Sequence, residues 1–292
     1  MSERKTVLEL LALTADYFKK NGVEAPRLEA ELLLAKALGC DRVALYVRYD
    51  KPLGDAEVAA YRALVARRAK QEPVHYILGE REFWSLAFEV GKGVLIPRPD
   101  TEVLVEEILR LVADRKDEPL AVADVGTGTG CLAVTLAREL PHARVVAGDI
   151  ADVPLALAQR NAERHGVADR VRVVRADGLA PLVAIGGPFD VVVSNPPYIP
   201  EADFARLPPH VRQEPREALI AGQDGLDVLR RIVADAPRAL VPGGIVALEV
   251  GDRAQADAVV ALFREVGAHD VHVRSDYAGD PRGVVARFPK TS

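Results

Sequence analysis

The residues best suited to do chemistry in this chain of 292 residues are Asn195, Pro196, Pro197 and Tyr198, which directly follow the apolar run 190–194. Two successive prolines hold the backbone extended and remove two amide donors, so their carbonyl groups can face a pocket. The side-chain oxygen of Asn195 and the carbonyl oxygen of Pro196 can then accept both hydrogens of a planar NH2 group, while Tyr198 covers its flat face. The motif predicts a site that binds and orients such a group.

A second motif is a glycine loop formed by Gly126, Thr127, Gly128, Thr129 and Gly130. It follows a predicted strand and opens a predicted helix, which is where ligands bind in a parallel sheet. Cys131 occupies the position where a dinucleotide fingerprint needs its third glycine, and no Gly-Lys-Ser/Thr of a phosphate loop follows. S-adenosyl-L-methionine (AdoMet) carries no phosphate and fits the loop better. An ordinary tight turn is the other interpretation of these glycines.

Acidic residues follow the next two predicted strands. Asp149 ends the second strand, where a carboxylate can accept hydrogen bonds from both ribose hydroxyls of a nucleoside. Asp177 and Gly178 follow the third strand, where we expect the adenine edge. Solvated strand ends are the alternative, but the glycine loop and the Asn195 motif at the same edge of the sheet favour a cofactor site.

The chemistry that such a site can perform is methyl transfer. An amide nitrogen is a weak nucleophile because its lone pair is delocalised, and acceptors of its N–H groups return electron density to it. Holding it roughly 3 Å from a methyl group on sulfur supplies the orientational part of catalysis. A sulfonium is a strong leaving group, so we assign no Asp or Glu as a base. The histidines are scattered and Cys40 and Cys131 isolated, so we expect no metal and no disulfide.

The elements that position these residues form a predicted alternation of strands and helices. An alternation of this kind implies an α/β fold with a mostly parallel, Rossmann-like sheet of seven strands and helices on both faces. The loop 275–283 is too short for a crossover helix, so the last strand should run antiparallel. The expected strands are 121–125, 144–149, 171–175, 190–194, 245–250, 271–274 and 284–288, and the expected helices 101–113, 131–140, 153–165, 226–240 and 255–266.

The first part of the chain has a different pattern, and we expect a small helical bundle over 1–80. Thr6 and Glu9 have the spacing of a capping box, and Gly22 and Gly39 can end helices. Further helices are expected after Pro26 and over 55–71. From Val74 to Ile96 the pattern changes to period two, which indicates a β-hairpin. The expected domains are 1–80 for substrate docking, 81–98 as a hairpin linker, and 99–292 for AdoMet-dependent methyl transfer.

The composition limits which kinds of binding partner and which cellular compartment we expect for this protein. Hydrophobic residues make up 49% of the chain, charged residues 28%, and the net charge is −5. This balance favours a globular protein with no stable nucleic-acid binding. No run reaches the roughly 18 apolar residues of a membrane span, and the start MSERKTVLELL lacks a secretory core. We expect a cytoplasmic monomer without membrane association.

Further motifs accompany the two already described, namely 76–79 with 82–84, 96–102, and 214–219 followed by 224–226. Together with the glycine loop and residues 195–199, they resemble the PrmC/HemK family, the release factor glutamine methyltransferases, over nearly the whole chain. The resemblance implies a class I AdoMet-dependent methyltransferase domain with an N-terminal helical domain. It also implies methylation of the side-chain amide nitrogen (N5) of glutamine in the Gly-Gly-Gln motif of class 1 peptide chain release factors, with S-adenosyl-L-homocysteine as product.

The resemblance also assigns roles by position. Residues 126–130 and Asp149 match the family's AdoMet contacts, Asn195 matches a residue that touches both cofactor and substrate, and residues 195–198 match the glutamine-binding motif. One departure concerns Gly178, which stands where some relatives place an aromatic side chain against adenine.

The alternative is an N6-adenine DNA or RNA methyltransferase, because Asn-Pro-Pro-Tyr also suits the exocyclic amine of adenine. Such an enzyme must flip its base and hold a phosphate backbone, which the charge of this chain does not favour. A non-enzymatic AdoMet sensor would leave the motif without a purpose.

Overall fold

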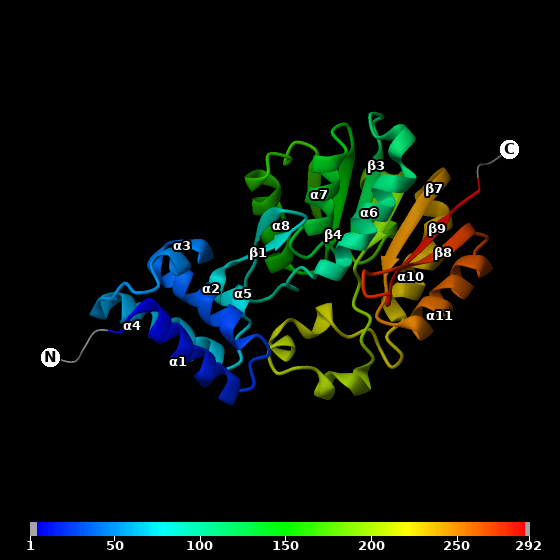
Figure 1. Ribbon diagram of the computed structural model, residues 1–292. Helices are drawn as coiled ribbons and strands as arrows, with labels where there is room; N and C mark the ends of the chain where they lie inside the picture. The colour runs from blue at the N-terminus through cyan, green and yellow to red at the C-terminus, as the bar shows by residue number, and fades with distance from the viewer. Residues whose placement is uncertain (1–4, 290–292) are drawn as a thin grey trace. The chain divides into compact units, whose positions relative to one another are not determined.

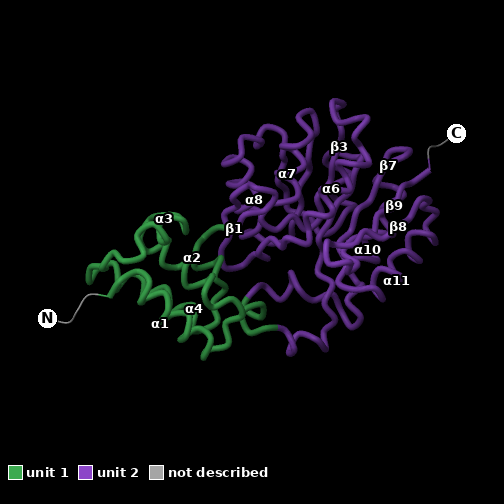
Figure 2. Tube along the Cα trace, viewed as in Figure 1, with its two compact units in different colours: residues 1–80, 208–213 green, residues 81–207, 214–292 purple. Residues whose placement is uncertain are grey.

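The computed structural model describes residues 5–289, so both outer ends of the expected domains, 1–4 and 290–292, lie outside the described residues. The chain divides into two compact units (Figure 2). Unit 1 comprises Met1–Glu80 and Pro208–Gln213, and unit 2 comprises Arg81–Leu207 and Glu214–Ser292. Residues 81–98, expected as a linker, are part of unit 2, where Phe83 and Phe88 are buried in its core.

Unit 1 is helical, with α1 (Val7–Lys20), α2 (Pro26–Leu38), α3 (Arg42–Val47), α4 (Asp55–Ala69) and α5 (Val74–Leu78). The predicted capping box is confirmed, because the Glu9 amide donates to the Thr6 hydroxyl and the Thr6 amide donates to the Glu9 carboxylate. Gly39, at φ 62°, ends α2 in the left-handed conformation as predicted. The core of this unit contains Phe18, Leu33 and Leu34, which are fully buried.

The prediction of extended structure from Val74 onward was wrong at its start, because residues 74–78 form the helix α5. Tyr76 and Ile77 are adjacent and both buried. A strand would turn them to opposite faces, whereas one helical turn can bury both on one side. The hairpin begins later, with β1 (Glu80–Phe83) and β2 (Leu86–Glu89), and its turn residues Trp84 and Ser85 have positive φ.

Unit 2 contains a seven-stranded sheet, which confirms the predicted fold class. The strands are β3 (Ala121–Val125), β4 (Arg144–Asp149), β5 (Val171–Arg175), β6 (Phe189–Ser194), β7 (Leu240–Glu249), β8 (His269–Ser275) and β9 (Pro281–Arg287). Their spatial order is β5-β4-β3-β6-β7-β9-β8. The pairs from β5 to β7 are parallel, and β9 runs antiparallel to both β7 and β8, as the short connection before it predicted.

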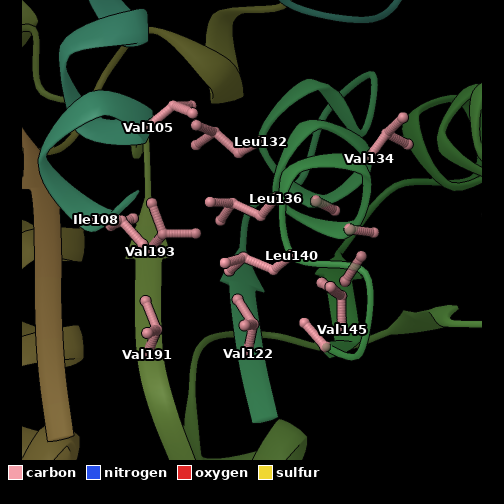
Figure 3. Close-up of a cluster of buried hydrophobic side chains, with 14 of the residues drawn as sticks. Val105, Ile108, Val122, Leu132, Val134, Leu136, Leu140, Val145, Val191 and Val193 are labelled. Carbon is pink, nitrogen blue, oxygen red and sulfur yellow. The ribbon is translucent and has the colours of Figure 1, made fainter. Parts of the chain in front are cut away.

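Helices cover both faces of this sheet (Figure 1). They are α6 (Glu102–Leu111), α7 (Cys131–Glu139), α8 (Asp152–Arg164), α9 (Ala180–Gly186), α10 (Asp227–Ala239) and α11 (Arg253–Glu265). The first three contribute to one core cluster and the last three to the other. Successive strand residues alternate between the clusters: Val191 and Val193 of β6 join Ile108 and Leu136 on the side of α6 and α7 (Figure 3), whereas Val192 belongs to the opposite cluster.

The order of the strands reverses at β3, which lies between β4 and β6. Crevices of parallel sheets form at such a switch point, outside the carboxyl ends of the strands. The 3₁₀ turns of the described residues are η1 (Pro99–Thr101), η2 (Ala113–Arg115), η3 (Glu201–Arg206), η4 (Val211–Gln213) and η5 (Arg216–Ala218).

Candidate active site

A pocket in unit 2 is lined by residues that follow the carboxyl ends of β3, β4, β5 and β6. It brings together most of the side chains that the sequence predicted for the site: Gly126, Thr127, Gly128, Thr129, Asp149, Asp177, Gly178, Asn195, Pro196 and Pro197. Gly130 and Tyr198 are not among the lining residues, and their positions are described below. Residues 93–95, Pro97, Thr101 and Glu217 are among the other residues that line the pocket.

The three glycines of the loop all have positive φ, at 71° for Gly126, 56° for Gly128 and 80° for Gly130. Their surroundings differ. A Cβ at Gly126 would meet nothing within 4 Å, whereas a Cβ at Gly130 would lie 3.1 Å from the Cα of Ala158 in α8. Gly130 therefore allows close packing of the loop against α8, and the first two glycines leave backbone exposed at the pocket.

Asp124, the fourth residue of β3, was not predicted as a site residue, and it holds the loop in shape. Its side chain is buried, and its Oδ2 accepts a hydrogen bond from the Thr127 hydroxyl at 2.6 Å and another from the Ala133 amide at 3.1 Å. Burial raises the pKa of Asp124 to about 7. Its residue type alone did not distinguish this support from a solvated strand end.

Asp149 at the end of β4 is fixed by two backbone amides. Its Oδ2 accepts from Gly128 at 3.0 Å and its Oδ1 accepts from Ala151 at 3.1 Å. Burial raises the pKa of this carboxyl. Each carboxylate oxygen can accept more than one hydrogen bond. The side chain is therefore held in place while it retains capacity for hydroxyl donors.

Asp177 and Gly178 lie beside Arg231, the one cationic side chain among the described lining residues. The Arg231 guanidinium from α10 donates to Asp177 Oδ1 at 2.9 Å, and both residues line the pocket. Gly178 has φ 86°, and a Cβ there would lie 3.3 Å from Arg231 Nη2. Because Arg231 is paired with a carboxylate, the lining that the structure describes offers no free cation of the kind that usually binds phosphate groups.

Asn195 is oriented by Thr101. Its Nδ2 donates to the Thr101 hydroxyl at 3.1 Å. Its Oδ1 is buried and, within residues 5–289, accepts no hydrogen bond. Buried acceptors in folded proteins are nearly always paired, so an orphan acceptor in a pocket wall indicates a place for a ligand donor.

Tyr198 differs from the neighbours in its motif, because its hydroxyl donates to Glu249 Oε1 at 3.2 Å and its carbonyl accepts from Gln255 Nε2 at 2.6 Å. Burial together with the neighbouring Glu249 carboxyl raises the pKa of Tyr198. Glu249 ends β7 and is itself 1% exposed. Burial raises the pKa of Glu249 to about 7, and the hydroxyl groups of Thr101 and Tyr198 partly offset that rise.

Glu214 anchors the chain that forms the remaining wall. Its fully buried side chain accepts from the Ile96 amide at 3.0 Å and from Arg98 Nη2 at 2.6 Å. Pro215, Glu217 and Pro97, which flank these groups in sequence, line the pocket. The motifs that contain Glu214 and Arg98 were recognised in the sequence. The contact between these two residues could not be predicted, because they are 116 positions apart and local patterns do not show which distant residues meet.

The residues of the pocket fit AdoMet. Gly126 and Gly128 admit a ligand close to the backbone, Asp149 offers a fixed carboxylate to the ribose hydroxyls, and an uncharged amide, Asn195, stands beside them. Within the described part of the chain, no cluster of three or more His, Cys, Asp or Glu side chains could hold a metal ion. None of the helices in that part is long and apolar enough to cross a membrane.

Two family models match the chain. The model described as the PrmC N-terminal domain matches residues 9–79, and the model described as the methyltransferase small domain matches residues 100–206. The first falls in unit 1 and the second in unit 2.

Solved structures support the fold of the chain. The hMettl16 catalytic domain in complex with MAT2A 3'UTR hairpin 6 aligns with a TM-score of 0.58 at 18% identity, covering 78% of this chain and 82% of that chain. The N-terminal domain of human METTL16 in complex with SAH aligns with a TM-score of 0.55 at 18% identity, covering 83% and 86%. At this level of identity the likeness establishes the methyltransferase fold alone.

Curated relatives are much more similar in sequence. A release factor glutamine methyltransferase of Geobacter sulfurreducens is 50% identical over 97% of both chains. One of Chlorobaculum tepidum is 43% identical over 97% of this chain and 98% of the relative, and one of Moorella thermoacetica is 46% identical over 91% and 92%. The family resemblance drawn from the sequence motifs is confirmed, and the chain belongs to the family of release factor glutamine methyltransferases.

Proposed function

We propose that this protein transfers a methyl group from AdoMet to N5 of the glutamine in the Gly-Gly-Gln motif of class 1 peptide chain release factors. The observation that carries the proposal is the buried Oδ1 of Asn195, which has no hydrogen-bond partner among residues 5–289 and lies in the wall of the pocket that also contains the glycine loop. The names of the curated relatives support the choice of acceptor.

The proposed site acts mainly by orientation. Asn195 Oδ1 and the Pro196 carbonyl accept hydrogen bonds from the two N–H groups of the glutamine amide. These hydrogen bonds raise the electron density on the amide nitrogen and fix its orientation. When bound, AdoMet would supply a methyl group on a positively charged sulfur. Transfer of this methyl group from sulfur to the amide nitrogen would leave S-adenosyl-L-homocysteine with a neutral sulfur, and the nitrogen would give one proton to solvent. No side chain is assigned as a base.

The cofactor side of the proposal assigns Gly126 to Gly130 and Asp149 to AdoMet, with Asp177 and Gly178 at its adenine end. In this assignment Asp149 accepts hydrogen bonds from the ribose hydroxyls. The amides of Gly128 and Ala151 fix the position of its carboxylate for this contact. Tyr198 is assigned a supporting role through Glu249, because its hydroxyl is engaged there.

Labelling with candidate acceptors tests the proposal. Purified protein with methyl-labelled AdoMet should label a release factor, and replacing the Gly-Gly-Gln glutamine of that factor by alanine should abolish the label. Adenine-containing DNA and RNA serve as competing acceptors in parallel reactions. Equal labelling of the nucleic acids, or labelling of the alanine variant of the factor, would contradict the proposal.

We further propose that unit 1 docks the body of the release factor and that the protein acts in the cytoplasm as a monomer without stable nucleic-acid binding. The net charge of −5 supports the last point. Comparing an intact release factor with a short Gly-Gly-Gln peptide tests the docking role. If unit 1 binds the body of the release factor, methylation of the intact factor should have a lower KM than methylation of the peptide, at similar kcat.

A further inference from the structure

We propose that Gln255 is a positioning residue for the acceptor side of the pocket, because it fixes the chain that leaves Pro196 and Pro197. The inference rests on the proposed function, in which Asn195 Oδ1 and the Pro196 carbonyl accept hydrogen bonds from a glutamine NH2 group. Proline has no amide hydrogen, so neither proline can be fixed to its surroundings as a backbone donor. A loop that contains two of them has to be fixed at its ends and through its carbonyl groups.

The start of this loop is fixed to the cofactor side of the sheet. Ser194, the last residue of β6, is fully buried, and its hydroxyl donates to the Val125 carbonyl at 2.5 Å. Val125 is the last residue of β3. This hydrogen bond therefore joins the residue before Asn195 to the residue before Gly126, and it fixes the acceptor loop relative to the glycine loop.

The end of the loop is fixed by Gln255, in the first turn of α11. Its Nε2 donates to the Tyr198 carbonyl at 2.6 Å, and its Oε1 accepts from the Gly251 amide at 2.9 Å. A backbone amide only donates, so the contact with Gly251 decides which end of the Gln255 side chain faces Tyr198. Gln255 is 8% exposed, so water competes little for these two hydrogen bonds.

Two glycines make room for the hydrogen bond between Gln255 and Tyr198. A Cβ at Gly225 would lie 2.6 Å from Gln255 Nε2 and would overlap the Tyr198 carbonyl oxygen. A Cβ at Gly251 would lie 3.0 Å from Gln255 Oε1 and 3.0 Å from Cδ2 of the Tyr198 ring. The surrounding chain thus packs closely on both partners, which leaves the Tyr198 carbonyl little freedom to move.

The consequence concerns the two oxygens assigned to the glutamine amide. Because the loop is fixed at Ser194 and at Tyr198, the Pro196 carbonyl between them has one direction relative to Asn195 Oδ1. Without the hydrogen bond from Gln255, the end of the loop can shift, and the two oxygens no longer match the two N–H groups of one NH2. Gln255 does not line the pocket, so it acts on the reaction through the loop.

Gln255→Glu tests this role, because it keeps an acceptor for the Gly251 amide and removes the donor to the Tyr198 carbonyl. The reaction is measured at pH 8, well above the ordinary pKa of glutamate, since a protonated carboxyl group would donate again. We expect kcat with a release factor to fall roughly tenfold, the value of one typical hydrogen bond. The Kd for AdoMet should stay unchanged, because the glycine loop keeps its own contacts.

Two further variants control for charge and for folding. Gln223→Glu makes the same change at an exposed residue whose side chain has no hydrogen bond within the described residues, and it should keep the wild-type kcat. Gln255→Met has a similar size and no charge. It should lower kcat at least as much as Gln255→Glu, and it gives a second reading should that variant fail to fold.

A double-mutant cycle separates positioning from general damage. In an Asn195→Ala background the pair of acceptor oxygens is already broken, so Gln255→Glu should lower kcat much less than it does in the wild type. General damage to the fold would lower kcat by the same factor in both backgrounds.

Three outcomes would overturn the inference: wild-type kcat in Gln255→Glu or Gln255→Met, an equal loss of kcat in Gln223→Glu, or additive losses in the double mutant. Each comparison requires that the wild-type protein labels the release factor. A wild-type protein that leaves the factor unlabelled would instead refute the proposed function, so the two failures are distinguishable.

Discussion

At the scale of single residues, the site depends on atoms whose hydrogen bonds are left incomplete by the fold. Asp149 and Asp124 have their partners within the protein, and these contacts shape the cofactor loop. Asn195 Oδ1 has none within the described residues. This contrast separates supporting residues from the residue assigned to contact substrate.

Asn195→Ala removes that acceptor. We expect kcat with a release factor to fall by roughly a hundredfold or more, because the amide nitrogen loses its orientation in the transition state. The Kd for AdoMet, measured by calorimetry, should change little. A variant unable to bind AdoMet would move Asn195 from the acceptor role to a purely cofactor one.

Gly130→Ala tests the packing of the glycine loop. The residue has φ 80°, and the new methyl group would lie 3.1 Å from the Cα of Ala158. Strain of this kind costs about 1–3 kcal/mol, so both the free energy of unfolding and the affinity for AdoMet should fall. Gly22→Ala is the control: it has φ 71° but nothing within 4 Å. If the two variants lose equal stability, the contact with Ala158 is unimportant.

At the scale of elements, the β1–β2 hairpin and the glycine loop are joined through α8. Asn161 is 0% exposed; its Oδ1 accepts from the Glu89 amide at 2.8 Å, and its Nδ2 donates to the carbonyls of Thr129 at 2.8 Å and Glu89 at 3.1 Å. One side chain thus satisfies three backbone groups from two segments. Neither segment could be shaped in this way by its own sequence.

Asn161→Ala leaves those three groups unpaired. We expect a loss of about 2–4 kcal/mol in the free energy of unfolding, measured with urea, and weaker AdoMet binding because the Thr129 carbonyl loses its partner. Gln159→Ala on the exposed side of the same helix removes only a contact with Glu163 and should change stability by less than about 0.5 kcal/mol. If Asn161→Ala binds AdoMet with unaltered affinity, the hydrogen bond from Asn161 to the Thr129 carbonyl is not needed for cofactor binding, and Asn161 supports the hairpin alone.

The elements of the sheet were predictable from the sequence because most strands contain a short run of apolar residues, mainly valine and alanine, between segments with a different pattern. The predicted 121–125, 144–149 and 171–175 coincide with β3, β4 and β5. The short helices α3 and α9 were not predicted, since one or two turns carry too little periodicity. Likewise, the contacts of Glu214 and Asn161 depend on tertiary packing that local patterns do not encode.

At the scale of the whole molecule, the division of the chain does not follow its sequence order. Residues 208–213 belong to unit 1, although both flanking segments belong to unit 2. A boundary predicted near residue 80 could not reveal this, because composition does not shift at either end of the segment. The chain therefore passes between the units at three positions, and the third leads directly to Glu214 and the pocket wall.

Global stability should depend on pH through buried carboxyl groups. Burial raises the pKa of Glu249 from 4.5, and that of Asp124 from 3.8, to about 7 in each case. Between about pH 4 and 7 the folded protein therefore holds protons that the unfolded chain releases, so these two groups make stability fall as pH rises through this window. Glu107 acts in the opposite sense: hydrogen bonds from Arg110 and His272 lower its pKa to about 2, and its contribution is lost only as pH falls below 4.5.

Glu249→Gln isolates one of these contributions. Glutamine does not titrate, so the variant should gain stability relative to the wild type as pH rises from 5 to 8, because only the wild type has to ionise a buried carboxyl group. Urea unfolding of both proteins at several pH values measures this difference, in which the other titrating groups cancel. A difference in the free energy of unfolding that stays constant across that range would mean that Glu249 has the same pKa in the folded and unfolded chains. Burial at the end of β7 would then not disfavour its ionised form.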